Sequence, residues 1–320
     1  MDGHPALTSD RATLLGMDQS TEITRRAEVL GRVATDRVLQ AVVRDGERVR
    51  LWPGTFMDWP DHDALSTTER YRITAIESAR KGGPNRTLSH VSALAVHQVP
   101  MLRPDLRRVH YIASAPTRHT ARVSRHNGIL LDDEREQVEG VWVTTRERAL
   151  CDAARLGTFE QAVAMLDAGL RAGADPVLID ATIERLRGHV GVERLRYANG
   201  FADARSESVG ESFSRALMAG MPEVPTPELQ VEIRDAAGRS IGRVDFLIGG
   251  VLVGEFDGKV KYSGTLGDDP PSEVVVKEKI REDALRAEGY VVIRWTWEDL
   301  LDPRRFRAVL RKGMRAAGLL

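Results

Sequence analysis

Residues 251–262, VLVGEFDGKVKY, constrain the fold more than any other stretch of this chain. The apolar run Val251–Val253 has no polar side, which is typical of a strand inside a sheet that is covered on both faces. Charged residues then occupy every second position, and side chains alternate along a strand. The stretch therefore predicts a central strand that leaves the core with four charges on one face: Glu255, Asp257, Lys259 and Lys261.

The last third of the chain predicts the order helix, strand, strand, strand, helix, strand, helix. Helical patterns cover residues 208–222 and 274–289, and a basic helix starts near Asp302. Strands are expected at 228–233, at 240–248, from Val251 onward and at 290–297, with Trp295 in the core and Thr296 capping the final helical stretch. Ser208 and Glu211 have the spacing of a capping box at the start of the first helix.

The acids of these strands favour a bound cation. Carboxylates on one sheet face repel each other, and Asp245 lies in the apolar context RVDFLI, where a charge needs a partner. Mg²⁺ or Mn²⁺ would remove the repulsion, because both prefer hard oxygen ligands. A bound cation would polarise a phosphoryl oxygen and activate water, with a nearby lysine orienting that water. The alternative is a ladder of salt bridges to Lys259, Lys261, Lys279 or Arg281 in a domain without catalytic activity.

The hairpin between the second and third strands gives a geometric test. With a strict two-residue turn at Gly249-Gly250, Asp245 would share a face with Gly254 and point away from Glu255. A shared metal site needs the two acids side by side. We therefore predict a loop of odd length or a bulge, which glycines often mark.

The pattern of Asp245 followed by Glu255-x-Asp257-x-Lys259 resembles the PD-(D/E)XK nuclease superfamily. More narrowly, RVDFLI, VGEFDGKVKY and EKIREDALRAEGYVVIRWTWEDL resemble the small domain related to very-short-patch-repair endonucleases. The resemblance implies a restriction-endonuclease-like α/β/α core over residues 205–320. It also implies metal ligands, catalytic residues and DNA-contacting residues: Asp245, Glu255, Asp257 and Glu211 as ligands, Lys259 and Lys261 beside them in catalysis, and Lys279 and Arg281 on a DNA-facing basic helix. Lys261 stands where that group often has a histidine.

Residues 23–62 predict a winged helix-turn-helix behind a flexible lead-in at 1–22. Helical spacing starts at Ile23, a second helix follows Thr35 or Asp36, Asp45-Gly46 marks a turn, and residues 47–51 and 55–57 form a hairpin. In this fold the second helix enters the major groove and the wing touches the phosphate backbone. The expected DNA-binding residues are Arg37, Gln40, Arg44, Arg48 and Arg50. A solvated arginine face or a protein adaptor is the alternative.

The middle region, residues 63–200, mixes helices and strands. Together with the winged helix, its segments TLSHVSALAVHQV and VEGVWVTTRERALCDAARLG resemble the AbiEi-type antitoxin family, which implies a toxin-like protein partner. The spacing of His90, His97, His110, His119 and His126 matches no common metal-ligand pattern, so we expect structural roles for His90 and His97.

Bulk composition narrows the classes of function. The formal net charge is −1, so contacts to nucleic acid must come from local clusters. Cys151 is the single cysteine, which excludes an intramolecular disulfide and fits the cytoplasm; we expect it to be a buried core residue. No secretory signal and no apolar run of membrane length is visible, so no membrane partner is expected.

These observations predict an α/β protein, α+β overall, with DNA as its partner. The leading hypothesis is an enzyme: a Mg²⁺-dependent DNA endonuclease or nickase targeted by the winged helix, in phage defence or a toxin–antitoxin-like system. The alternative is a non-catalytic DNA-binding regulator or antitoxin-like protein with a degenerate nuclease fold.

Overall fold

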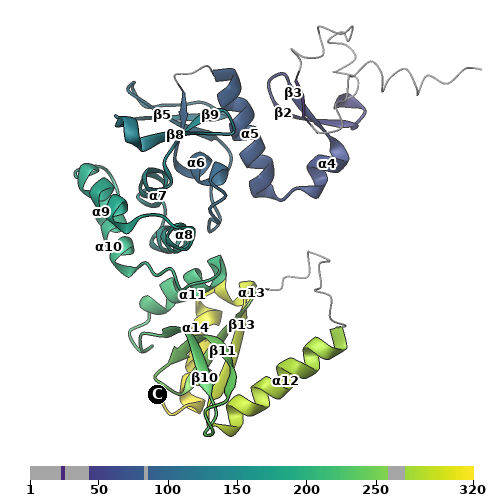
Figure 1. Cartoon of the computed structure of the whole chain (residues 1–320), viewed down its shortest axis with the longest axis vertical. Helices are drawn as coiled ribbons and strands as arrows, with labels where there is room; N and C mark the ends of the chain where they lie inside the picture. The colour runs from purple at the N-terminus through teal and green to yellow at the C-terminus, as the bar shows by residue number, and fades with distance from the viewer. Residues whose placement is uncertain (1–22, 26–42, 83–85, 259–270) are drawn as a thin grey trace, which may run out of the picture. The chain divides into compact units, whose positions relative to one another are not determined.

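A computed structural model describes residues 23–25, 43–82, 86–258 and 271–320 (Figure 1). These residues confirm the mixed α+β class. They form two compact units, one from the residues up to 98 together with 105–149, and one from 99–104 together with 150–320. Residues 150–200, which the sequence groups with the middle region, therefore pack with the C-terminal region. No helix among the described residues is long and apolar enough to cross a membrane.

The first unit begins with a small sheet in the order β1-β3-β2. The strands β2 (Arg48–Trp52) and β3 (Thr55–Asp58) form the expected hairpin. Ile23, which was expected to open a helix, instead lies in β1 (Ile23–Arg25), because it pairs with Met57 of β3. The helices predicted between 27 and 42 lie outside the described residues; Val43 and Arg44 are helical and precede the turn.

A six-stranded sheet in the order β6-β7-β5-β4-β9-β8 makes up most of the first unit. Its strands are β4 (Thr87–Leu88), β5 (Val109–Ala113), β6 (Arg118–His119), β7 (Val123–Asn127), β8 (Arg135–Val138) and β9 (Val141–Thr144). A 3-10 turn at Asp132–Glu134 precedes β8, and the helices are α4 (Trp59–Ala64), α5 (Thr67–Gly82) and α6 (His90–Val96). The boundary between the units falls within α7 (Arg146–Ala154), where Cys151 is buried as expected.

Helices open the second unit: α8 (Phe159–Arg171), α9 (Pro176–Arg185), α10 (Val192–Phe201) and α11 (Val209–Ala219). A buried ion pair ties α11 to α8, with Arg215 Nη2 2.8 Å from both carboxylate oxygens of Asp167. Breaking such a pair would leave one charge buried without its partner, so it holds the two helices together strongly. Together with the apolar core that contains Ala164 of α8 and Phe213 of α11, this pair joins residues 150–200 to the C-terminal region.

The remaining elements follow the order that the sequence predicts. They are β10 (Glu228–Arg234), β11 (Ser240–Ile248), β12 (Leu252–Asp257), α12 (Pro271–Ala287), β13 (Val291–Thr296), α13 (Trp297–Leu300) and α14 (Pro303–Ala316). The strands form one sheet in sequence order, antiparallel except for the parallel pair β12–β13 that α12 connects. A core on one sheet face involves α11 and α14, and a smaller core involves Leu285 of α12.

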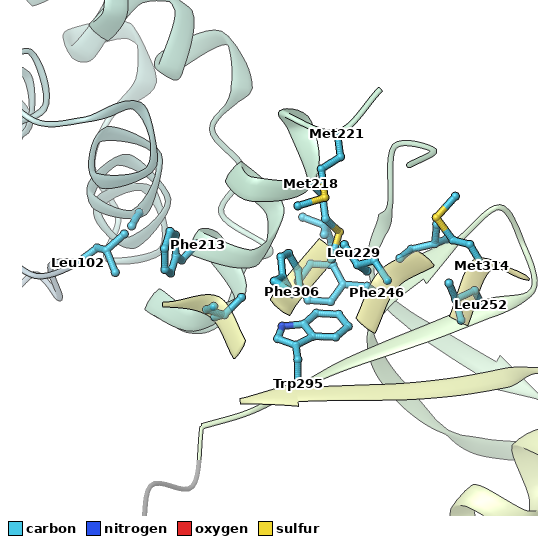
Figure 2. Packing of buried hydrophobic residues seen from close by; sticks show 14 residues of the cluster. Leu102, Phe213, Met218, Met221, Leu229, Phe246, Leu252, Trp295, Phe306 and Met314 are labelled. Carbon is cyan, nitrogen blue, oxygen red and sulfur yellow. The ribbon is translucent and has the colours of Figure 1, made fainter. Parts of the chain in front are cut away.

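Trp295 lies at the centre of the larger core (Figure 2), 1% exposed, with its ring centroid 5.5 Å from that of Phe246 and 5.3 Å from that of Phe306. Its indole N–H donates to the Ser214 hydroxyl of α11 at 2.7 Å, which satisfies the buried donor. A Cβ on Gly254 would lie 2.5 Å from this indole, so glycine lets β12 approach the ring. The predicted positions of Trp295 in the core and of Thr296 as a helix cap are confirmed.

The β11–β12 hairpin has an odd loop, as predicted. Phe246 pairs with Gly254 and Ile248 pairs with Leu252, so three residues, Gly249 to Val251, connect the strands. Both glycines adopt positive φ, +58° and +73°, which favours glycine at this turn. The paired residues end at Phe246 and Gly254, and one step further in the same register would set Asp245 opposite Glu255.

Candidate active site

Asp245 and Glu255 come together where β11 and β12 approach their open end. Residues opposite each other in an antiparallel pair point to the same face, so the three-residue loop places both carboxylates on one side. The Asp245 carboxylate also accepts the backbone N–H of Phe256 at 2.8 Å. The side chain therefore takes the place of a ladder hydrogen bond and is held at the strand end.

The carboxyl group of Asp245 is the most perturbed acid in this sheet. The pKa of this group is raised to about 6, mainly by burial and in part by the negative charges of Glu211 and Glu255. The Phe256 N–H and Arg281 act in the opposite direction. Three acids from α11, β11 and β12 therefore act on one another electrostatically. Such mutual repulsion is what a bound divalent cation would relieve.

Glu255 is neutralised by two arginines. One of its oxygens accepts from Arg281 of α12, and the other accepts Arg294 Nε of β13 at 2.9 Å. Arg294 lies at the level of Glu255 in the parallel β12–β13 pair, so their side chains share a face. Glu278 and Glu282 of α12 bind Arg294 in turn, which extends the cluster into a network of three carboxylates and two guanidinium groups.

Glu211 and Asp245 differ from Glu255, because the groups that donate hydrogen bonds to them are neutral. Glu211, 8% exposed at the start of α11, accepts the backbone N–H of Glu207 and the side-chain amide of Gln230, both at 2.8 Å. Gln230 of β10 lies at the level of Asp245, because its two neighbours in β10 pair with the two neighbours of Asp245 in β11. Its φ of +54° is a strained conformation for a residue with a side chain. Strain of this kind is typical of functional sites, and no feature of the sequence ELQVEI indicates it.

The other predicted site residues of the second unit are exposed or lie outside the described residues. Asp257 is exposed at the end of β12, and Lys279 is exposed on α12. Lys259 and Lys261 lie outside the described residues, so their predicted roles remain predictions. The structure thus brings together Glu211, Asp245, Glu255 and Arg281.

The donor chemistry fits a hard divalent cation, since Glu211, Asp245 and Glu255 supply carboxylate oxygens that repel one another. The arrangement is not a preformed cage. Among the described residues, the acids do not converge within 4.8 Å as a group of three. Cation binding at Glu255 would therefore require exchange with Arg281 or Arg294, and the predicted Mg²⁺ or Mn²⁺ site remains a prediction.

The predicted DNA-contacting residues of the first unit separate into three groups. Arg37 and Gln40 lie outside the described residues. Arg44 is exposed beside Asp45, whereas Arg48 is buried, 6% exposed, with Nε 2.5 Å from Asp58. Arg48 therefore does not face solvent, because its register in the hairpin places it opposite Asp58.

Arg50 has a different setting, at a cavity of about 280 Å³ in the first unit. Arg122 stacks on the ring of Trp52 there at 4.8 Å and donates to the Leu51 carbonyl at 2.9 Å. Basic side chains from β2, α5 and the segments before β5 and β7 line this cavity: Arg50, Arg70, Arg107, Arg108 and Arg122. The convergence of these arginines from distant segments was not predicted. Guanidinium groups bind phosphate, so a cavity lined by several of them is suited to the backbone of a nucleic acid.

Three histidines of the first unit also converge, a grouping that the sequence did not predict. Ligand nitrogens of His90, His110 and His126 all lie within 4.8 Å of one another. Burial and the neighbouring His126 lower the pKa of His110 to about 4. His97 is separate from this group and contacts the Thr144 carbonyl at 2.8 Å.

Comparisons with known proteins give relatives whose names describe no function. No protein-family model matches the chain. Two proteins of Mycobacterium tuberculosis, Uncharacterized protein MT2308 and Uncharacterized protein Rv2248, are each 26% identical over 295 residues, covering 88% of this chain and 98% of theirs. A solved structure, the RV2827C protein from M. tuberculosis, matches with a TM-score of 0.43 at 17% sequence identity. The match covers 63% of this chain and 80% of the RV2827C chain, and a similarity this low supports no conclusion about function.

The raised pKa of Asp245 predicts a pH-dependent cost to stability. Between pH 4 and 6 the folded state keeps a proton that the unfolded state has lost, so stability falls as the pH rises through this window. Asp245→Asn stays neutral and can still accept the Phe256 N–H. We expect it to raise the free energy of unfolding by about 1–2 kcal/mol at pH 7.5, a value reduced for partial exposure, and to have little effect at pH 4.

Urea unfolding at pH 4, 5.5 and 7.5 measures this difference. Asp283→Asn, on an exposed position of α12, is the matched control and should show no such trend. A variant of Asp245 that is equally or less stable than the wild type at pH 7.5 would contradict the electrostatic description.

Proposed function

We propose that the chain is a Mg²⁺-dependent DNA endonuclease or nickase whose site is built on Asp245, Glu255 and Glu211. The observation that carries the proposal is the approach of the two strand ends. The three-residue β11–β12 loop sets the register, and the Asp245 carboxylate accepts the N–H of Phe256, the residue after Glu255. The element order of residues 209–316 follows the order that the sequence pattern predicts. The resemblance to PD-(D/E)XK nucleases, which implies a nuclease-like core over residues 205–320, covers the same region. Mg²⁺ or Mn²⁺ at this site would polarise a phosphoryl oxygen and lower the pKa of a water molecule.

The protein's own residues would have distinct roles. The Phe256 N–H holds one oxygen of the Asp245 carboxylate. This hydrogen bond fixes the orientation of the carboxylate, whose other lone pairs would bind the cation. Glu211 is positioned by Gln230, and Glu255 is held by Arg281 and Arg294 until a cation or a phosphate competes. A DNA phosphate could take over an arginine from Glu255, which would couple DNA binding to release of that carboxylate.

Plasmid nicking with Mg²⁺ or Mn²⁺ tests the proposal. The wild type should convert supercoiled plasmid to nicked or linear product, and Asp245→Asn should lower the rate at least about 100-fold, because it removes a direct ligand. Asp283→Asn should cut at the wild-type rate. Since Asp245→Asn is expected to be stabilised, lost cleavage would not reflect unfolding. Equal cutting by the wild type and Asp245→Asn would reject the site.

The alternative function, a non-catalytic DNA-binding regulator or antitoxin-like protein, is favoured by one observation. Both oxygens of Glu255 are already paired with arginines, an arrangement that is stable without a cation. The basic cavity at Arg50 would then serve DNA binding alone. A toxin-like protein partner and a role in phage defence belong to the same set of hypotheses, through the resemblance to AbiEi-type antitoxins.

DNA binding in a chelator, measured by fluorescence anisotropy over a salt series, tests the contribution of the cavity under either function. Arg50→Ala should weaken binding and reduce the slope of log K against log salt by about 1, as expected for one lost phosphate contact. Arg187→Ala, an exposed arginine of the second unit, is the matched control. An unchanged slope in Arg50→Ala would remove the cavity from the DNA interface.

A further inference from the structure

The six-stranded sheet brings three histidines together from distant positions in the sequence. His110 lies on β5 and His126 on β7, and the parallel register pairs His110 with Ser124 and Ile112 with His126. Both histidines therefore point to the same face of the sheet. His90 follows β4 directly and begins α6, and the backbone N–H of Ser89 donates to the His110 carbonyl at 3.0 Å, which places His90 beside β5.

The ring nitrogens lie at distances suited to a shared metal ion. His110 Nδ1 and His126 Nε2 are 2.9 Å apart, and the ligand nitrogens of all three histidines lie within 4.8 Å of one another. Zinc–nitrogen bonds of about 2.0–2.1 Å in a tetrahedron place ligand nitrogens about 3.3 Å apart. The ring centroids of His90 and His126 are 3.8 Å apart in a stacked arrangement. Imidazole lone pairs lie in the ring plane, so one of these two rings has to turn about its side-chain bonds to share an ion with the other.

Hydroxyl groups next to the histidines orient them. The Ser89 hydroxyl lies 2.9 Å from His90 Nδ1, and we therefore assign Nε2 of His90 as the ligand atom. Fixing one ring nitrogen by a hydrogen bond while the other binds metal is common at zinc sites. His90 is 1% exposed with φ +53°, a costly backbone conformation that directs a buried imidazole toward the other two.

We propose that His90, His110 and His126 bind one zinc ion, with the fourth position left for water or another ligand. Three imidazoles favour Zn²⁺ over Mg²⁺, which prefers oxygen ligands. The ion would connect the start of α6 to β5 and β7, and so would stabilise the first unit. This site is built from residues other than the acids of the proposed nuclease centre, and its test does not depend on cleavage.

Zinc titration of the chelator-treated full-length protein, in competition with a chromogenic chelator, tests the proposal. One equivalent should bind and raise the Tm, with excess Mg²⁺ unable to displace it. His110→Asn and His126→Asn should each weaken binding at least about 100-fold, because a direct ligand is lost. Asp245→Asn should bind zinc as the wild type does, which separates this site from the proposed active site.

His119→Asn and His97→Asn are the matched controls. His119 lies next to the cluster, with its ring 6.0 Å from that of His126 and Nδ1 2.7 Å from the Ser124 hydroxyl, but it is not one of the three ligands. Both controls should retain wild-type affinity. Far-ultraviolet circular dichroism of each variant in chelator establishes folding, and two ligand variants are used so that one misfolded protein does not decide the result. Absence of zinc binding, or equal losses in the control and ligand variants, would overturn the proposal.

Discussion

Repulsion between the carboxylates of Glu211, Asp245 and Glu255 is the constraint on which the proposed active site depends. The glycines of the β11–β12 loop create it, since a loop of three residues places Asp245 opposite Glu255, whereas a loop of two would separate them. Burial is the main cause that raises the pKa of Asp245 to about 6, and the charges of Glu211 and Glu255 add to the rise. A fold that tolerates this cost near neutral pH is suited to a site that binds a cation.

Arg281 and Arg294 offset part of the same repulsion. They occupy both oxygens of Glu255, so a divalent cation and the two guanidinium groups compete for one carboxylate. The two proposed functions differ on the outcome of that competition. In an enzyme, DNA phosphates draw the arginines away and the cation binds, whereas in a non-catalytic protein the arginines remain in place.

Local pattern was sufficient to predict much of the second unit. The strand pattern, the odd hairpin loop and the core position of Trp295 follow from residue alternation and turn chemistry, and all are confirmed. Pairings between distant segments were not predictable. His110 and His126 meet only because β5 and β7 pair in parallel, and Arg294 reaches Glu255 only through the parallel crossover. Arg48 was wrongly expected at the surface, because its partner Asp58 depends on the hairpin register.

Titration of the Asp245 carboxyl group by carbon-13 NMR, without divalent cation and with saturating Mg²⁺, tests the central claim most directly. We expect a pKa of about 6 without the cation and a clear fall when Mg²⁺ binds, because the ion stabilises the charged form. A pKa at or below the ordinary value of about 3.8, or a value that Mg²⁺ does not change, would contradict the claim that these carboxylates form a cation site.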